Sequence, residues 1–401
     1  MHIAGYLKKN GIKHVIKIIW RYKIDLIIKQ IMGVFLKNSK LKDIIVIESH
    51  NDFDCNGGAF YKYLIRKGYN KKYKIVWRLK NPKLIKGNLP YNVSWVHENR
   101  PGIMKNYYLW TAKYLLSDDI ISASNRKDQV SVYCTHGGCT FKNVKGLINV
   151  PGNVDYILSS SKNYDPYMCS NYSIPYPNNR MLHIGFPSND ELFNYRNNEL
   201  CKITKRKFKK VILWMPTFRK SKFGRKDCDT DLPLGIPVID NIEKLNSLNL
   251  LLESLDCGLV IKFHPMQDMS SVKQCNKFNN IFMLDARKTK ELNVDIYRLM
   301  ACCDALVSDY SSSAYSYLML DRPLGFVLSD LNEYKLGFSV DGIDRFLTGK
   351  KIYSYSDFVQ FIKDVAEGND TYGAKRKALL NWMYEYCDGN ASKRLAEFLN
   401  L

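Results

Sequence analysis

The chain has 401 residues, 46% of them apolar, and its 60 Lys and Arg against 39 Asp and Glu give a net charge of +21. This length and apolar content suit a globular protein with room for two hydrophobic cores, and they exclude a disordered chain. The positive charge favours anionic partners, which could be phosphate-bearing substrates, nucleic acid or an acidic membrane surface.

The cysteines and the apolar runs indicate the cellular compartment. The eleven cysteines form no CxxC pair, and Cys302 and Cys303 are adjacent, so we expect free thiols in a reducing, cytosolic compartment. No charge-free apolar run approaches the roughly 18 residues of a membrane span. We also find no signal-peptide pattern at the N-terminus.

Residues 1–42 carry ten Lys or Arg against a single acid, Asp25. Apolar residues recur at helical spacing from Ile12 to Phe35, and Lys13, Lys17 and Arg21 form a like-charged row. This pattern predicts a basic amphipathic helix that binds an anionic membrane surface. The alternative is a helix packed on the protein's own body with its basic face outward.

Short apolar strands then alternate with helices, which is typical of parallel sheets covered by helices. The strands are expected at residues 41–47, 73–77, 114–117, 130–134 and 156–160, and then at 211–215, 258–263, 281–285, 302–307 and 323–328. Helices are expected from 59, over 102–113, 314–320 and 356–366, and over 374–401. A polar basic linker is expected at 197–210.

This alternation of strands and helices predicts an α/β fold. We divide the chain into the basic segment 1–42, a first domain at 43–200, a second at 205–375, and a C-terminal helix at 376–401 that could cross back onto the first domain. No GxGxxG or Walker A motif is present.

Two candidate residues follow strands of the first domain. Glu48 comes directly after the first strand, and His136 follows the strand at 130–134, with Gly137 and Gly138 behind it. Glycines let a ligand approach the backbone, and an imidazole is suited to general-base catalysis near neutral pH. The alternative for His136 is a structural histidine.

The second domain repeats this arrangement. Thr217 and Arg219 follow the strand at 211–215, and His264 precedes Pro265 after the strand at 258–263. The stretch from Ser308 to Ser313 lies between a strand and a helix, where serine hydroxyls and free backbone N–H groups suit a phosphate. The alternative is that these serines only cap the helix.

The stretch Asp227 to Asp231 resembles the DxD motif of metal-dependent sugar transferases. It follows a polar basic loop rather than a buried strand, so we prefer a solvated loop and predict no metal site.

Several motifs in order resemble the CDP-glycerol glycerophosphotransferases of teichoic-acid and capsule assembly, which include poly(ribitol phosphate) relatives. The resemblance covers roughly residues 43–370. Its motifs are Ile47 to Ser49, Asn106 to Leu116, His136-Gly137, Gly185 to Pro187 with Asn189-Asp190, Met215 to Arg219, Lys262 to Pro265, Ser308 to Ser312, Asp321 to Pro323 and Asp330 to Tyr334. The sequence departs from the family's Gly-Thr-Pro-Leu-Lys pattern at residues 138–142.

The resemblance implies a GT-B-like architecture, with two Rossmann-like domains facing a cleft. It implies a peripheral enzyme at the cytoplasmic face of the membrane, with His136 and His264 in its active site. A polyol phosphate, expected to be glycerol phosphate, would pass from a CDP-polyol donor to a hydroxyl of a lipid-linked or polymeric acceptor, releasing CMP. No cofactor and no nucleic-acid partner are expected.

The expected roles follow from this reaction. His136 would take the acceptor's proton, and His264 would donate to the phosphoryl oxygens or the leaving group. The donor pyrophosphate would be held by Ser311, Ser312, Ser313, Thr217 and Arg219. Further cleft residues would be Glu48, Gly137, Asp309 and Glu333. Because a carboxylate repels a pyrophosphate, Asp309 is expected to turn toward a Lys or Arg, or to orient a histidine.

Three rival functions remain open at this point. A GT-B glycosyltransferase using a nucleotide sugar would share the fold. A non-catalytic nucleic-acid-binding protein would explain the charge, although no RNP or helix-turn-helix pattern is visible. The third is a membrane-surface scaffold without activity.

Overall fold

The computed structural model describes residues 12–85, 87–194, 199–219, 221, 227–228, 230, 232–269 and 278–401. Residues 1–11 of the predicted basic segment lie outside this range, as do Asp229 and Asp231 of the DxD-like stretch. The chain divides into two compact units. The first contains residues up to 137, 146–190 and 388–401, and the second contains 138–145 and 191–387.

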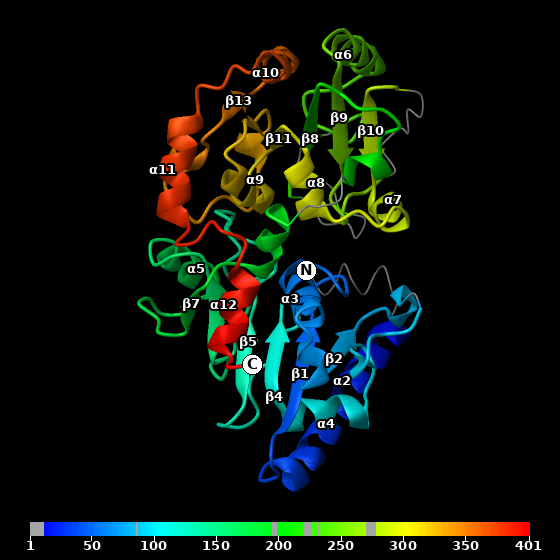
Figure 1. The fold of residues 1–401 in the computed structure, drawn as a ribbon, viewed down its shortest axis with the longest axis vertical. Helices are drawn as coiled ribbons and strands as arrows, with labels where there is room; N and C mark the ends of the chain where they lie inside the picture. Colours follow the sequence, from blue (N-terminus) through cyan, green and yellow to red (C-terminus); the bar gives the residue numbers. More distant parts are fainter. Residues whose placement is uncertain are drawn as a thin grey trace. The chain divides into compact units, whose positions relative to one another are not determined.

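The first unit is built on a seven-stranded sheet with the order β3-β2-β1-β4-β5-β6-β7, in which all pairs are parallel (Figure 1). Its strands are β1 (Lys42–Glu48), β2 (Lys74–Leu79), β3 (Val93–His97), β4 (Ala112–Ser117), β5 (Val130–Tyr133), β6 (Tyr156–Ser159) and β7 (Met181–His183). Its helices are α2 (Ile12–Leu36), α3 (Cys55–Arg66), α4 (Ile103–Thr111), α5 (Asp165–Asn171) and α12 (Ala391–Phe398).

The second unit holds a six-stranded parallel sheet with the order β10-β9-β8-β11-β12-β13. Its strands are β8 (Lys210–Trp214), β9 (Cys257–Lys262), β10 (Ile281–Leu284), β11 (Ala305–Ser308), β12 (Leu324–Val327) and β13 (Lys350–Ile352). Its helices are α6 (Ile242–Ser254), α7 (Ala286–Glu291), α8 (Ile296–Cys302), α9 (Ser312–Tyr317), α10 (Tyr355–Glu367) and α11 (Gly373–Met383).

Both strand orders have the doubly wound pattern in which the chain reverses direction after the third strand, so both units are Rossmann-like. The strands read as continuous apolar runs because parallel strands are covered on both faces. All six residues of β9 are buried, for example, and its Cys257, Leu259 and Ile261 contribute to the core of the second unit together with β8, β11, α6 and α10. In such sheets, ligand-binding side chains follow the carboxyl ends of the strands.

The predicted elements differ from the structure at several ends. The sequence predicted one helix over 374–401, but the structure has two, α11 and α12, with Gly389 in the left-handed region at φ 66° between them. The strand predicted at 302–307 begins only at Ala305, because Cys302 still ends α8. The helix predicted from residue 59 begins four residues earlier, at Cys55.

The helix α2 packs on α4 through one side. The single acid of this region, Asp25, accepts hydrogen bonds from Gly102 N (3.2 Å) and Asn106 Nδ2 (2.9 Å), and pairs with Lys105 Nζ at 2.7 Å. A Cβ on Gly33 would lie 2.5 Å from the Trp110 ring, so the two helices approach closely there. Asp25 therefore anchors α2 to the first unit.

The apolar stripe predicted for this helix points away from that anchor. Ile24, Ile27, Ile31 and Phe35 are 42%, 54%, 52% and 76% exposed. Other exposed apolar side chains, including Ile18 and Tyr22, lie on further sides of α2, so the predicted two-faced helix is not confirmed. Among the described residues, no helix is long and apolar enough to cross a membrane.

Candidate functional site

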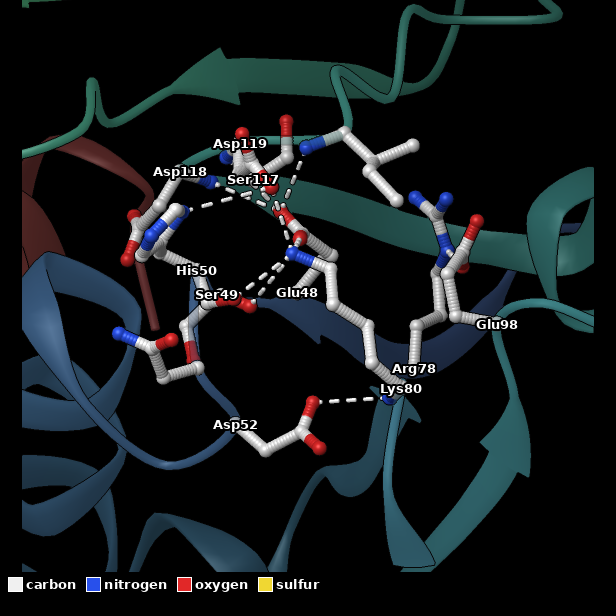
Figure 2. A network of polar contacts seen from close by, with 12 residues as sticks. Glu48, Ser49, His50, Asp52, Arg78, Lys80, Glu98, Ser117, Asp118 and Asp119 are labelled. Atoms are coloured by element: carbon white, nitrogen blue, oxygen red, sulfur yellow. Dashed lines mark hydrogen bonds and ion pairs between the residues drawn. The ribbon is translucent and has the colours of Figure 1, made fainter. Parts of the chain in front are cut away.

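In the first unit, charged side chains gather where β1, β2 and β4 end (Figure 2). Glu48, fully buried, accepts backbone N–H bonds at Oε2 from Asp118, Asp119 and Ile120 at 3.0–3.1 Å. Its Oε1 lies 2.9 Å from Lys80 Nζ, and that amine lies 2.6 Å from Asp119 Oδ2. Glu48 therefore fixes the loop after β4 and holds Lys80 in place.

The charges in this cluster stabilise one another. Burial by itself lowers the pKa of Lys80, but Glu48 and Asp119 outweigh it and raise that pKa above its ordinary value. The neighbouring His50 holds the pKa of Asp119 far below its usual range, and Lys80 adds to this shift against the opposing effect of burial. Lys80 and Asp119 are therefore both charged at neutral pH.

His136, the predicted base, lies at the edge of this cluster. Its ring centroid is 3.8 Å from that of His50, and His50 Nδ1 lies 3.5 Å from Asp119 Oδ2. Burial among neighbouring atoms and the nearby His50 lower the pKa of His136 to about 4. The residue as a whole is exposed to solvent, and water opposes part of this lowering. The imidazole is neutral at neutral pH.

The backbone around His136 is held in an unusual shape. Thr135 and Gly137 on either side have φ of 64° and 86°, and a positive φ is unfavourable for a β-branched residue such as threonine. The buried Asn56 amide stabilises this turn. Its Nδ2 donates to the carbonyl oxygens of Cys134 (2.8 Å), Thr135 (3.1 Å) and Gly137 (3.1 Å).

The N-terminus of α3 completes this arrangement. Gly137 N donates to Cys55 Sγ (3.2 Å), and Gly57 N donates to the buried Asp118 carboxylate at 2.9 Å. A Cβ on Gly58 would lie 2.3 Å from the carbonyl oxygen of Phe53, so only glycine fits there. The Asn56-Gly57-Gly58 run therefore serves close backbone packing beside His136.

The second unit has its own polar cluster, built around Arg219. This residue is 4% exposed. Its Nε and Nη2 donate to Asp330 at 2.7 and 2.9 Å, and its Nη1 donates to Asp309 Oδ2 and to the carbonyl of Thr217, both at 2.7 Å. Four of the five N–H groups of this guanidinium are used in these bonds. Arg219 therefore joins the loops after β8, β11 and β12.

Asp309 turns toward an arginine, one of the orientations expected from the sequence. It also accepts from Thr217 N (2.8 Å) and Thr217 Oγ1 (2.5 Å). Burial raises the pKa of Asp309, but Arg219 and Lys142 outweigh that effect and lower it. Lys142 Nζ donates to Thr217 Oγ1 at 3.2 Å, and Lys142 ends the stretch 138–142 that departs from the family pattern.

The predicted serines occupy the start of α9. Ser311 is the N-cap residue, yet its side chain makes no capping hydrogen bond. Ser311, Ser312 and Ser313 are half-buried. The Ser313 hydroxyl lies 3.4 Å from that of Ser308, which donates to the carbonyl of Met215 at 3.2 Å. The side chain of Ser311 therefore does not fill the capping role.

His264 lies next to Phe218, with ring centroids 5.0 Å apart. Its Nδ1 accepts a hydrogen bond from Met266 N at 3.1 Å. A neutral imidazole whose Nδ1 accepts carries its proton on Nε2, so His264 presents an Nε2–H donor. Glu333 is exposed and accepts from Thr230 Oγ1 at 2.6 Å.

The structure thus groups the predicted residues by unit. Glu48, His136 and Gly137 belong to the first unit, and the remaining predicted residues belong to the second. The sequence analysis missed His50, Lys80 and Asp119, although each lies one or two residues beyond a buried strand. Among the described residues, no three His, Cys, Asp or Glu side chains form a group that could hold a metal ion.

Two Rossmann-like units, each with polar side chains after its strands, make up a GT-B-like fold. The chain belongs to the CDP-glycerol:poly(glycerophosphate) glycerophosphotransferase family, whose sequence model matches residues 31–401. The family, the fold class and the transfer of polyol phosphate from a CDP-polyol to a polymer, all predicted from the sequence, are confirmed.

Curated relatives belong to teichoic-acid synthesis. The chain is 24% identical to a teichoic acid poly(glycerol phosphate) polymerase of Bacillus spizizenii W23, over 80% of this chain and 82% of that one. It is 22% identical to the teichoic acid glycerol-phosphate primase of Bacillus subtilis 168, over 86% and 89%. Among solved structures, the wall teichoic acid polymerase TagF superposes with a TM-score of 0.74 at 20% identity, covering 100% of this chain and 98% of that one.

Proposed function

We infer that this enzyme transfers glycerol phosphate from CDP-glycerol to a hydroxyl of a lipid-linked or polymeric acceptor, releasing CMP. The observation that carries this assignment is the family match over residues 31–401. The relatives include both polymerases and primases acting with glycerol or ribitol phosphate. The first unit, near the predicted 43–200 domain, takes the acceptor, and the second, near 205–375, takes the donor.

His136 is the general base in this proposal. Its neutral imidazole can accept the proton of the attacking hydroxyl, and the glycine after it lets the acceptor approach the backbone. The low pKa of His136 means that it stays unprotonated into the acidic range. Glu48 contributes by fixing the loop that carries Asp119.

The donor pyrophosphate is held at the start of α9. The hydroxyls of Ser311, Ser312 and Ser313 and the backbone N–H groups there donate to phosphate oxygens, and Lys142 supplies positive charge close by. Arg219 and Thr217 serve the donor by holding this loop in place, since most of their hydrogen-bonding groups are already used. Asp309 and Glu333 belong to the same loops.

His264 acts as a donor in this reaction. Its Nε2–H can bind a phosphoryl oxygen as negative charge shifts toward the leaving CMP. Because phosphoryl transfer depends mainly on positioning and charge stabilisation, a neutral donor suffices for this role.

The exposed apolar residues of α2 support attachment to the cytoplasmic face of an anionic membrane. They lie beside Lys17, Arg21 and Lys23 on a helix whose only acid, Asp25, is used against α4. Apolar side chains can enter the lipid interface while basic ones meet the headgroups, at about 1 kcal/mol for each basic residue near the surface.

A donor panel tests the proposed reaction. The purified chain is incubated with a polyol-phosphate acceptor and, separately, with CDP-glycerol, CDP-ribitol and UDP-sugars, and the released nucleotide is measured. CMP release with CDP-glycerol, matched by glycerol phosphate incorporated into acceptor, is expected. Release of UDP from a sugar donor, with none of CMP, would show a glycosyltransferase instead.

A further inference from the structure

His50 packs against His136, but the proposed reaction gives a role only to His136. The two rings approach from the ends of β1 and β5, with centroids 3.8 Å apart and planes inclined by 40°. Behind His50 stands Asp119, with its Oδ2 3.5 Å from His50 Nδ1, which is within ion-pair range but longer than a hydrogen bond. Lys80 and Glu48 hold that carboxylate in place (Figure 2).

We propose that His50 is a positioning residue for His136. Packed against the His136 ring, it keeps that imidazole oriented, unprotonated and ready to accept the acceptor's proton. This inference rests on the proposed role of His136 as general base.

The physical reason is the repulsion between two imidazoles in contact. A proton on one ring disfavours a proton on the other. Contact with His50 therefore disfavours protonation of His136.

Other charged groups around His136 also change its pKa, some upward and some downward. Lys80, from the end of β2, lowers its pKa together with His50, whereas Asp119 and Asp54 raise it. From the neighbouring elements, Glu48 faces Lys80, and the Cys55 thiol of α3 accepts from Gly137 N. The lowering contributions outweigh the raising ones, and His50 is the largest charge contribution after burial.

A direct measurement uses the full chain with isotope-labelled histidine and follows the imidazole NMR signals against pH. The His136 signal is assigned by its loss in His136→Phe. In the wild type, His136 should titrate below the ordinary value of about 6.5. In His50→Phe, which keeps a ring in place but removes the imidazole nitrogens, the His136 pKa should rise by roughly one unit. His50→Gln serves as a second variant if the first does not fold.

Asp119→Asn provides a test in the opposite direction. The Asp119 carboxylate raises the pKa of His136 and pairs with Lys80, whose positive charge lowers that pKa. Loss of the carboxylate should therefore lower the pKa of His136 further. A simple loss of packing would not produce opposite shifts in the two variants. If the His136 pKa is the same in wild type and His50→Phe, His50 only packs, and the inference is overturned.

The pH profile of kcat/KM connects the pair to catalysis. A base works when unprotonated, so a higher pKa of His136 moves the acidic limb to higher pH. His50→Phe should therefore lose most activity at low pH and least on the alkaline plateau. Turnover retained by His136→Asn would overturn the proposed base and, with it, the positioning role. The NMR titration would still report whether the two rings are coupled, so the two failures are distinguishable.

Discussion

At the scale of the residue, His136 carries the most direct prediction. His136→Asn removes the proton acceptor but keeps a polar side chain, so turnover should fall by about 10²–10⁴-fold, the usual effect of losing a general base. Steady-state CMP release measures this. His97, a half-buried histidine that ends β3, provides the matched control, and His97→Asn should leave turnover near the wild-type value.

The serines at the start of α9 give a second residue-scale prediction. Ser311→Ala with Ser312→Ala removes two hydroxyl donors but leaves the backbone N–H groups, so CDP-glycerol should bind more weakly by about 1–3 kcal/mol and not lose binding altogether. Isothermal titration calorimetry measures the affinity. An unchanged affinity would mean that the hydroxyls do not touch the donor.

Sequence reasoning chose its candidate residues from their position at or just after the end of a strand. It selected Glu48, His136, Thr217 and His264 in this way, and their roles stay predictions. It also predicted that Asp309 would turn toward a cation or orient a histidine, and Asp309 does bind Arg219. It assigned Arg219 to the donor, but could not show that Asp309 and Asp330 already occupy most of its guanidinium. Partners distant in the chain, such as Asp330, become visible only when the fold brings their loops together.

At the scale of the element, Arg219 joins the ends of three strands of the second unit. Arg219→Ala would leave Asp309 and Asp330 buried without their partner, so we expect a loss of about 3–5 kcal/mol in the stability of that unit. Urea unfolding followed by tryptophan fluorescence measures it. Arg287→Ala is the control, because Arg287 is 75% exposed and pairs only across the surface with Glu291.

The start of α3 gives the second prediction at this scale. In Gly58→Ala the new methyl group would meet the carbonyl of Phe53, so the loop before α3 must shift, at a cost of about 1–3 kcal/mol. The melting temperature and the turnover should both fall, since this loop supports His136 through Asn56. Gly152→Ala, where nothing lies within 4 Å of the added Cβ, should change neither.

The ends of elements were harder to predict than their existence. The helix α3 begins at Cys55, directly after a loop in which Asp52 and Phe53 adopt positive φ, which side-chain propensity does not foresee. The C-terminal region reads as one helix because its apolar residues continue at helical spacing. The break is set by Asp388-Gly389-Asn390, and by Asp190, whose carboxylate accepts N–H bonds from Ala391 and Ser392 at 2.8 Å.

At the scale of the whole molecule, membrane attachment is the principal prediction. Ile27→Glu with Ile31→Glu changes two exposed residues of α2 without touching Asp25 or Gly33, so the fold should persist while binding to anionic vesicles falls. Vesicle sedimentation measures the bound fraction, which should also fall with added salt because exposed charges are screened over about 8 Å.

The control for this experiment lies in the second unit. Leu250→Glu changes an apolar side chain of α6 that is 65% exposed, and it should leave vesicle binding unchanged. If the α2 variant sediments with vesicles as the wild type does, α2 is not the attachment site.

The fold class followed from the alternation of apolar strands and helices, because helices connect the strands of a parallel sheet and the two therefore alternate along the chain. The sequence analysis also raised the possibility that the C-terminal helix crosses back, and residues 388–401 do lie in the first unit. It did not predict that the segment 138–145 lies in the second unit while its neighbours in the chain belong to the first, since this depends on distant contacts.

This return of the chain has a consequence for synthesis on the ribosome. Domains generally fold as their residues emerge, beginning with the N-terminal one. Here the end of the chain contacts two strands of the first unit. The Leu399 carbonyl, directly after α12, accepts a hydrogen bond from the Tyr114 hydroxyl, and the Phe398 ring packs against Tyr156, with 4.8 Å between centroids. The first unit therefore cannot complete these contacts until residues 191–387 have been translated, and until then it exposes the surface that α12 later covers.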